Sequence, residues 1–147
     1  MSNSVVITSA VRTAVGSLGK SLKNVSGDSL GSSVISESIN KSQIKNDEID
    51  EVIMGQVLTG GAGQNPARQA AMKSGVPKEK PAYIVNQVCG SGLRSVASGF
   101  QSIKSGDSKI VIAGGQESMS LAPHAIHLRE GKKLGNTEMT DTMIKDG

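Results

Sequence analysis

Large aromatic side chains are almost absent from this 147-residue sequence, in which Tyr83 and Phe100 stand alone and tryptophan does not occur. Aromatic residues supply the largest buried areas in most protein cores. The core must therefore be built from small and β-branched side chains, which let backbones approach one another closely. The length is enough for one domain, but such a composition is more typical of a part of a larger assembly than of a self-sufficient small domain.

Cysteine and blocks of charge are also scarce. Cys89 is the only cysteine, which excludes an intrachain disulfide and a cysteine-based metal site. The 16 Lys and Arg residues and the 13 Asp and Glu residues are scattered along the chain and give a net charge of +3. With no basic block and hardly any aromatic side chain to stack on bases, we expect no binding to nucleic acid.

Long apolar runs do not occur either, and none approaches the roughly 18 residues of a membrane span. The N-terminal sequence MSNSVVITSAVRT lacks the basic segment and the long apolar stretch of a signal peptide. We therefore expect a soluble, cytoplasmic protein that does not bind membranes.

Four short apolar runs are typical of strands that are buried on both faces. They are Ser4–Thr8, Glu51–Leu58, Ala82–Val88 and Lys109–Ala113. Helical patterns separate them, with Asp28 as the expected N-cap of the first helix, Pro66 at the start of the second and Ser91 near the start of the third. This alternation predicts an α/β fold with a mostly parallel sheet and helices on both faces.

The regular alternation ends near Ser120. We expect residues 1–120 to form the α/β domain, and residues 121–147 to leave the sheet as a separate segment, which we call the excursion. The excursion holds both histidines, His124 and His127, and the basic stretch Arg129–Lys133. Surface or interface histidines are a better interpretation than a zinc pair, because further ligands are missing nearby. The basic stretch is either a solvated turn or a site for a phosphorylated ligand or an acidic partner surface.

Residues 86–95, NQVCGSGLRS, contain Cys89, the residue in the chain that is best suited to act as a nucleophile. Cys89 lies between the expected third strand and the third helix, near the positive end of the helix dipole. Because the first backbone N–H groups of a helix lack partners inside it, the amides of Cys89 and Gly90 are candidate donors to an oxyanion. An exposed sulfur nucleophile and a buried structural cysteine are about equally good interpretations of this position, because free cysteine is among the most buried residue types.

A nucleophilic thiol at this position would still need a base. An ordinary cysteine is only about 3% thiolate at pH 7. A helix N-terminus contributes typically about 0.3–1 kcal/mol, which leaves most of the thiol protonated. The turn can therefore position the sulfur, but a second group must activate it.

Gly114, Gly115 and Glu117 follow the last expected strand, at the end of the sheet where α/β proteins place ligands. A tight turn with a solvated glutamate is the alternative interpretation. A dinucleotide-binding fingerprint is missing, because no G-x-G-x-x-G follows the first apolar run.

Several stretches, in the same order along the chain, resemble the N-terminal portion of the thiolase family, and most closely its biosynthetic acetyl-CoA acetyltransferases. They are NQVCGSGLRS around Cys89, GQNPARQAA at Gly63–Ala71, AGGQESMS at Ala113–Ser120 and TDTMIKDG at the end of the chain. The resemblance extends from the first apolar run to the last residue. It implies a thiolase-like N-terminal half, incomplete as given.

The resemblance implies acyl transfer between thioesters through an acyl-enzyme on Cys89, with the Cys89 amide in an oxyanion hole. The reaction would be the Claisen condensation of two acetyl-CoA molecules to acetoacetyl-CoA, and its reverse, thiolysis. Coenzyme A thioesters would be substrates, with no covalently bound cofactor and no metal. The excursion resembles the family's segment that helps to pair dimers into homotetramers. This implies an interface role for His127, Arg129, Lys132 and Lys133.

The sequence also departs from the family. The Gly-His-Pro histidine that activates the cysteine, the second cysteine and the Asn-Glu-Ala-Phe-Ala motif are absent from these residues. In the family they belong to the C-terminal half, so we expect the 147-residue chain to be inactive alone. A non-catalytic interaction subunit with a thiolase-like fold is the alternative. A ketoacyl synthase is less favoured, because Asn86–Gly92 has the thiolase form.

Overall fold

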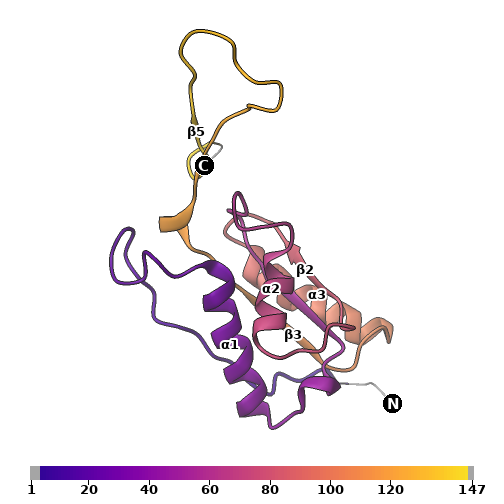
Figure 1. The fold of residues 1–147 in the computed structure, drawn as a ribbon. Helices are drawn as coiled ribbons and strands as arrows, with labels where there is room; N and C mark the ends of the chain where they lie inside the picture. The colour runs from indigo at the N-terminus through magenta and orange to yellow at the C-terminus, as the bar shows by residue number, and fades with distance from the viewer. Residues whose placement is uncertain (1–3, 146–147) are drawn as a thin grey trace.

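The fold is a small parallel sheet flanked by helices, and the computed structural model describes it for residues 4–145 (Figure 1). The helices are α1 (Gly27–Ser42), α2 (Pro66–Lys73) and α3 (Ser91–Ser105), with short 3-10 helices η1 (Asn46–Glu48) and η2 (Met119–Leu121). The strands are β1 (Glu51–Gly55), β2 (Ala82–Val85), β3 (Val111–Gly115), β4 (His124–Ala125) and β5 (Thr140–Asp141). Strands β1 to β3 form one parallel sheet in the order β2-β1-β3. The predicted α/β class is confirmed.

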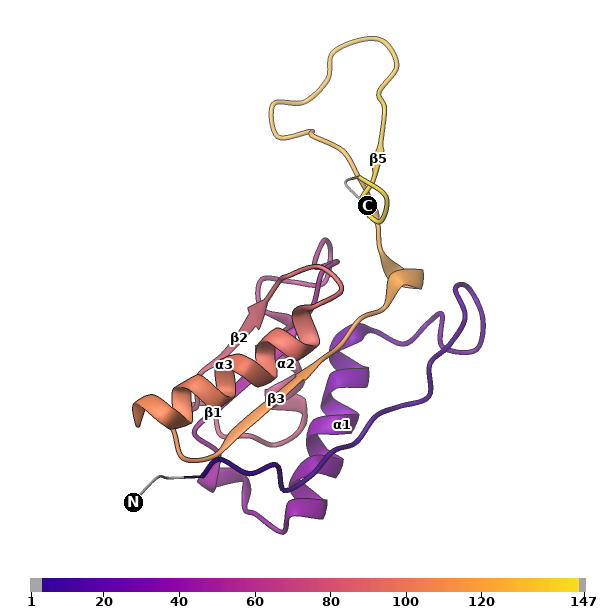
Figure 2. The same ribbon diagram turned by 180° about the vertical axis from the view of Figure 1, so that it is seen from behind.

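The central strand β1 separates two helical layers, because successive side chains of a strand point to opposite faces. Val52 and Met54 belong to the apolar cluster that α1 and α2 complete. On the other face, the Glu51 carboxylate accepts a hydrogen bond from Ser102 of α3, and Gly55 lies against the first turn of α3. Figure 2 shows α3 and α1 on opposite sides of the sheet. The expectation of helices on both faces is thus met.

The core consists of aliphatic and small side chains. The buried members of its main cluster are Ile35 and Ile39 from α1, Ile49, Val52 and Met54 from β1 and its approach, Ala67, Ala70 and Ala71 from α2, and Val76. Three alanines on α2 allow α1 to pack closely, which agrees with the near absence of aromatic residues in the sequence. Asp28 of α1 and Lys73 of α2 add an ion pair between the two helices.

Local signals in the sequence explain where the helices begin and end. The Asn65 side chain caps α2 by accepting a hydrogen bond from the Arg68 amide at 2.9 Å, and Pro66 occupies the first turn. Helix α3 ends at Gly106, whose φ of 88° suits glycine. For α1 the expected cap was wrong: Ser26 is the N-cap residue, and Asp28 lies in the first turn.

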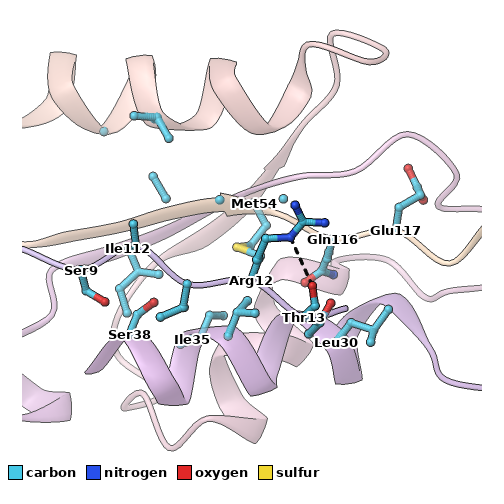
Figure 3. Close-up of a pocket in the computed structure, with 18 of the residues that line it drawn as sticks. Ser9, Arg12, Thr13, Leu30, Ile35, Ser38, Met54, Ile112, Gln116 and Glu117 are labelled. Atoms are coloured by element: carbon cyan, nitrogen blue, oxygen red, sulfur yellow. Dashed lines mark hydrogen bonds between the residues drawn. The ribbon is translucent and has the colours of Figure 1, made fainter. Parts of the chain in front are cut away.

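The expected strand at Ser4–Thr8 is not formed. Val6 and Ile7 are 71% and 78% exposed, and the segment is separated from β3 by a cavity of about 830 Å³ that both line. Strand pairing needs a neighbouring backbone about 4.8 Å away. The prediction of a strand buried on both faces was therefore wrong, because the segment is largely exposed and pairs with no strand of the sheet. Figure 3 shows Ser9 and Arg12, which follow this segment, and Ile112 of β3 among the residues that line the cavity.

The other strands begin or end at different residues than expected. β1 ends at Gly55 rather than Leu58, β2 ends at Val85 rather than Val88, and β3 spans Val111–Gly115 rather than Lys109–Ala113. β1 and β2 end early because the backbone turns at the end of the sheet. There the amides of Val57, Gln87 and Val88 donate hydrogen bonds to side chains and not to a neighbouring strand.

After β3 the chain passes through η2 and forms a short antiparallel ladder, in which His124 pairs with Asp141 and Ala125 with Thr140. The loop between β4 and β5 projects away from the sheet (Figure 1). A division into domains at residue 120 stays a prediction. Within residues 4–145, no helix combines the length and apolar character needed to cross a membrane.

Asp50 connects the residues just before β1 to those just before β3 through hydrogen bonds, and its substitution tests this connection. Its carboxylate accepts hydrogen bonds from the amides of Ile110 at 3.0 Å and Lys109 at 2.7 Å. These bonds, Ile110 first, lower the pKa of the Asp50 carboxyl below its ordinary value of 3.8, because they stabilise the charged form. Their contribution to stability is therefore complete above pH 3.8 and is lost as the pH falls through the lower folded-state pKa.

We expect Asp50→Asn to lower the free energy of unfolding at neutral pH by about 1 kcal/mol, because the amide oxygen can still accept both bonds but lacks the charge that strengthens them. The difference from the unsubstituted chain should shrink when urea unfolding is repeated at progressively lower pH below 3.8. A difference that stayed constant at acid pH would contradict this account of Asp50.

Candidate active site

The candidate site lies at the carboxyl ends of the parallel strands, where the loops after β1, β2 and β3 meet. Cys89 belongs to the loop between β2 and α3 and is exposed. The strand-to-helix turn predicted for Cys89 is therefore present. A buried structural cysteine, the alternative interpretation, is wrong for this structure.

Close packing between glycines places α3 against the end of the sheet. A Cβ atom built on Gly55 would lie 2.4 Å from the carbonyl carbon of Ser91 and 2.6 Å from the nitrogen of Gly92. A Cβ atom on Gly115 would lie 3.3 Å from the Cα of Gly92. Helix α3 can begin at this point only because these positions lack side chains. The sequence patterns did not single out Gly55, although a glycine inside an apolar run is a signal for close backbone approach.

The Cys89 turn, residues 86–91, is held by its own hydrogen bonds. The amides of Gln87, Val88, Gly90 and Ser91 all donate within the turn. The Gly90 amide donates to the Gln87 carbonyl at 3.0 Å, so its expected availability to an oxyanion was wrong. The Cys89 amide is not among the four that the turn uses.

Glu117 joins two of the loops at the site. Its carboxylate accepts hydrogen bonds from the Val57 amide at 2.9 Å and from the Leu58 amide at 3.3 Å. The side-chain amides of Gln116 and Gln56 add a buried hydrogen bond of 2.9 Å between the same loops. The solvated glutamate that the sequence offered as an alternative is therefore wrong, because Glu117 holds the loop after β1 in place.

The histidines and the basic stretch lie on the excursion. His124 Nε2 lies 3.7 Å from Asp141 Oδ2 across the β4–β5 ladder, and Arg129–Lys133 is exposed. In the described part of the chain, no three His, Cys, Asp or Glu side chains are grouped so that they could hold a metal ion. An interface role for His127, Arg129, Lys132 and Lys133 stays a prediction.

The cavity beside β3 is a separate feature. Figure 3 shows it lined by Met54 and Ile112 from the sheet, Ile35 from α1 and Arg12 from the N-terminal segment. Its lining is largely apolar, and Cys89 is not part of it. The thiol therefore belongs to the open surface at the strand ends rather than to this cavity.

Comparisons with known proteins agree with this geometry. Residues 5–147 match the family Thiolase, N-terminal domain. The acetyl-CoA acetyltransferases of Rhizobium meliloti and Shinella zoogloeoides are 57% and 53% identical to the chain over its whole length. The cytosolic acetyl-CoA acetyltransferase of Rattus norvegicus is 48% identical over 99% of the chain.

A solved structure matches as well. The crystal structure of the Bacillus anthracis acetyl-CoA acetyltransferase superposes with a TM-score of 0.87 and 37% identity, and the match covers 93% of this chain and 35% of that one. The chain spans 38% of the length of the first two curated relatives. The family match over almost the entire chain and the shared fold lead to one conclusion: this chain belongs to the thiolase family and corresponds to its N-terminal domain.

Proposed function

We propose that this chain supplies the acyl-accepting cysteine of an acetyl-CoA acetyltransferase. The Cys89 sulfur attacks the thioester carbonyl of acetyl-CoA, an acetyl-thioester forms on the enzyme, and coenzyme A leaves. A second acetyl-CoA then loses an α-proton and attacks the acetyl group, which gives acetoacetyl-CoA and frees Cys89. The observation that carries the proposal is an exposed thiol at a strand-to-helix turn in a thiolase-family chain.

The developing oxyanion needs a donor, and the backbone amide of Cys89 is our candidate. The neighbouring amides at Val88, Gly90 and Ser91 are engaged within the turn, whereas that of Cys89 is not used there. An amide fixed before the reaction stabilises the tetrahedral intermediate without reorganisation. Nucleophile and oxyanion donor would thus come from the same residue.

Activation of the thiol requires groups from outside these residues. The imidazoles of the described chain, His124 and His127, lie on the excursion and not in the loops around Cys89. We propose that the activating base and the group that removes the α-proton come from the C-terminal part that full-length relatives have, and that the chain alone does not turn over. The alternative, a non-catalytic interaction subunit, predicts no acetylation of Cys89 even when that part is present.

The test uses a hybrid enzyme, in which this chain replaces the matching N-terminal residues of the 57% identical Rhizobium meliloti relative. We expect brief incubation with acetyl-CoA, followed by acid quenching and peptide mapping, to find one acetyl group on Cys89. The chain without the C-terminal part should show negligible thiolysis of acetoacetyl-CoA. An acetyl group elsewhere in the hybrid would refute the assignment of the nucleophile.

We further propose that the excursion contributes to a homo-oligomer, a tetramer in the full-length protein, and that the protein acts in the cytoplasm. The exposed apolar residues of the excursion, among them Leu134 at 91% and Met139 at 59% exposure, favour an interface. Acetyl-CoA and acetoacetyl-CoA are the proposed substrates. Residues that contact coenzyme A are not assigned.

A further inference from the structure

The residue before the proposed nucleophile has an unfavourable backbone conformation. Val88 has a φ of 49°, in the left-handed region that β-branched residues rarely adopt. Its side chain is 64% exposed, so burial of the valine does not compensate for the strain. Such a conformation persists only where the surroundings enforce it.

Two side chains hold Val88 from opposite ends of the turn. The Ser91 hydroxyl donates to the Val88 carbonyl at 2.6 Å and accepts from the Gln87 amide at 2.9 Å. The Asn86 side-chain oxygen accepts from the Val88 amide at 2.9 Å. The Val88 amide is therefore held by a side chain, and the Val88 carbonyl is held by both the hydroxyl and the backbone amide of Ser91, at 2.6 and 3.1 Å. Ser91 is only 4% exposed.

Ser91 also connects the turn to the rigid part of the fold. It is the first residue of α3, and its backbone packs against Gly55 at the end of β1. The Ser91 side chain thereby fixes the backbone conformation of Val88, and this conformation sets the direction in which the chain enters Cys89. If Val88 relaxed to a negative φ, both the Cys89 sulfur and the Cys89 amide would change direction.

We propose that Ser91 and Asn86 are positioning residues for acyl transfer, and that they act by holding Val88 in its left-handed conformation. The inference rests on the proposed function of Cys89. In the step concerned, the bond between the Cys89 sulfur and the acetyl carbon forms and the thioester bond to coenzyme A breaks. Coenzyme A leaves as a thiolate, which takes up a proton from solvent to replace the one that the Cys89 thiol lost. Small errors in the approach of sulfur and carbonyl slow such steps strongly.

The experiment measures this half-reaction on the 147-residue chain, in which Cys89 is the only thiol. At mildly alkaline pH the solvent ionises enough thiol, so that no missing base is required. Acetylation by acetyl-CoA is followed by mass spectrometry, for the native chain and for the chain in urea. We expect the native chain to react roughly tenfold faster, because the turn orients sulfur and amide.

Ser91→Ala should remove most of this advantage, with a slowing of roughly tenfold. The double variant Val88→Gly with Ser91→Ala should recover to within about threefold of the native rate, because glycine adopts the left-handed conformation without help. A purely structural role for Ser91 would not produce this rescue. Ser95→Ala is the matched control: Ser95 is also buried on α3 and donates to Gly92 and Gly114 carbonyls, so its loss should change stability and not the acetylation rate.

Asn86 provides variants at an exposed position that will not prevent folding. Asn86→Ala should slow acetylation, and Asn86→Ser, whose hydroxyl can accept the same bond without adding a charge, should slow it less. If Ser91→Ala and Asn86→Ala both react at the native rate, or if Val88→Gly does not rescue a folded Ser91→Ala chain, the positioning role is wrong. Equal rates for the native and the urea-unfolded chain would instead contradict the proposed nucleophilic site itself.

Discussion

Replacement of Cys89 by serine is expected to lower the turnover of the hybrid enzyme by at least about 10⁴-fold, in line with the loss of a catalytic nucleophile in other enzymes. The serine hydroxyl is almost the same size but is far less ionised at neutral pH, and it forms an ester in place of a thioester. The assay is thiolysis of acetoacetyl-CoA by coenzyme A, with substrate above saturation so that kcat is measured.

Folding should not change in Cys89→Ser, because the side chain is exposed and forms no disulfide. We therefore expect the same urea midpoint for the two proteins, within error. This separates a chemical defect from a structural one. A variant that kept more than a tenth of the activity would show that another group accepts the acetyl unit.

Gly55→Ala is expected to have the largest effect on the structure. The added methyl group would lie 2.4 Å from the carbonyl carbon of Ser91 and 2.6 Å from the Gly92 nitrogen. Backbone atoms cannot move aside as the end of a flexible side chain can, so β1 and α3 must separate. We expect the free energy of unfolding in urea to fall by about 3 kcal/mol, the upper end of the usual cost of overpacking.

Gly114→Ala is the matched control, because Gly114 lies on the neighbouring strand and its added Cβ would meet only Met54 atoms at 3.8 and 3.9 Å. Its free energy of unfolding should change by less than about 0.5 kcal/mol. Because α3 carries the Cys89 turn, Gly55→Ala should also slow acetylation of Cys89 in any fraction that folds. Equal losses of stability in both variants would argue against the glycine contact as the reason.

The local patterns of the sequence determined the order of helices and sheet strands from Gly27 to Gly115 and the place of Cys89 among them. Asn65 and Pro66 marked the start of α2, and an apolar run before Cys89 with a helical pattern after it located the turn between strand and helix. These features are local, since they depend on capping, on fixed backbone angles and on the spacing of neighbouring residues. The thiolase motifs in the same order led to the family, which the comparisons confirm.

Tertiary structure alone decided which residues hold the site together. The Glu117 carboxylate accepts hydrogen bonds from amides about sixty positions away in the chain, and Gly55 lies against the first turn of α3. Neither contact could be derived from periodicity, because it depends on how the loops converge at the end of the sheet. The same limit explains Ser4–Thr8: its sequence favours a strand, but a strand needs a neighbour, and the arrangement in space places a cavity there.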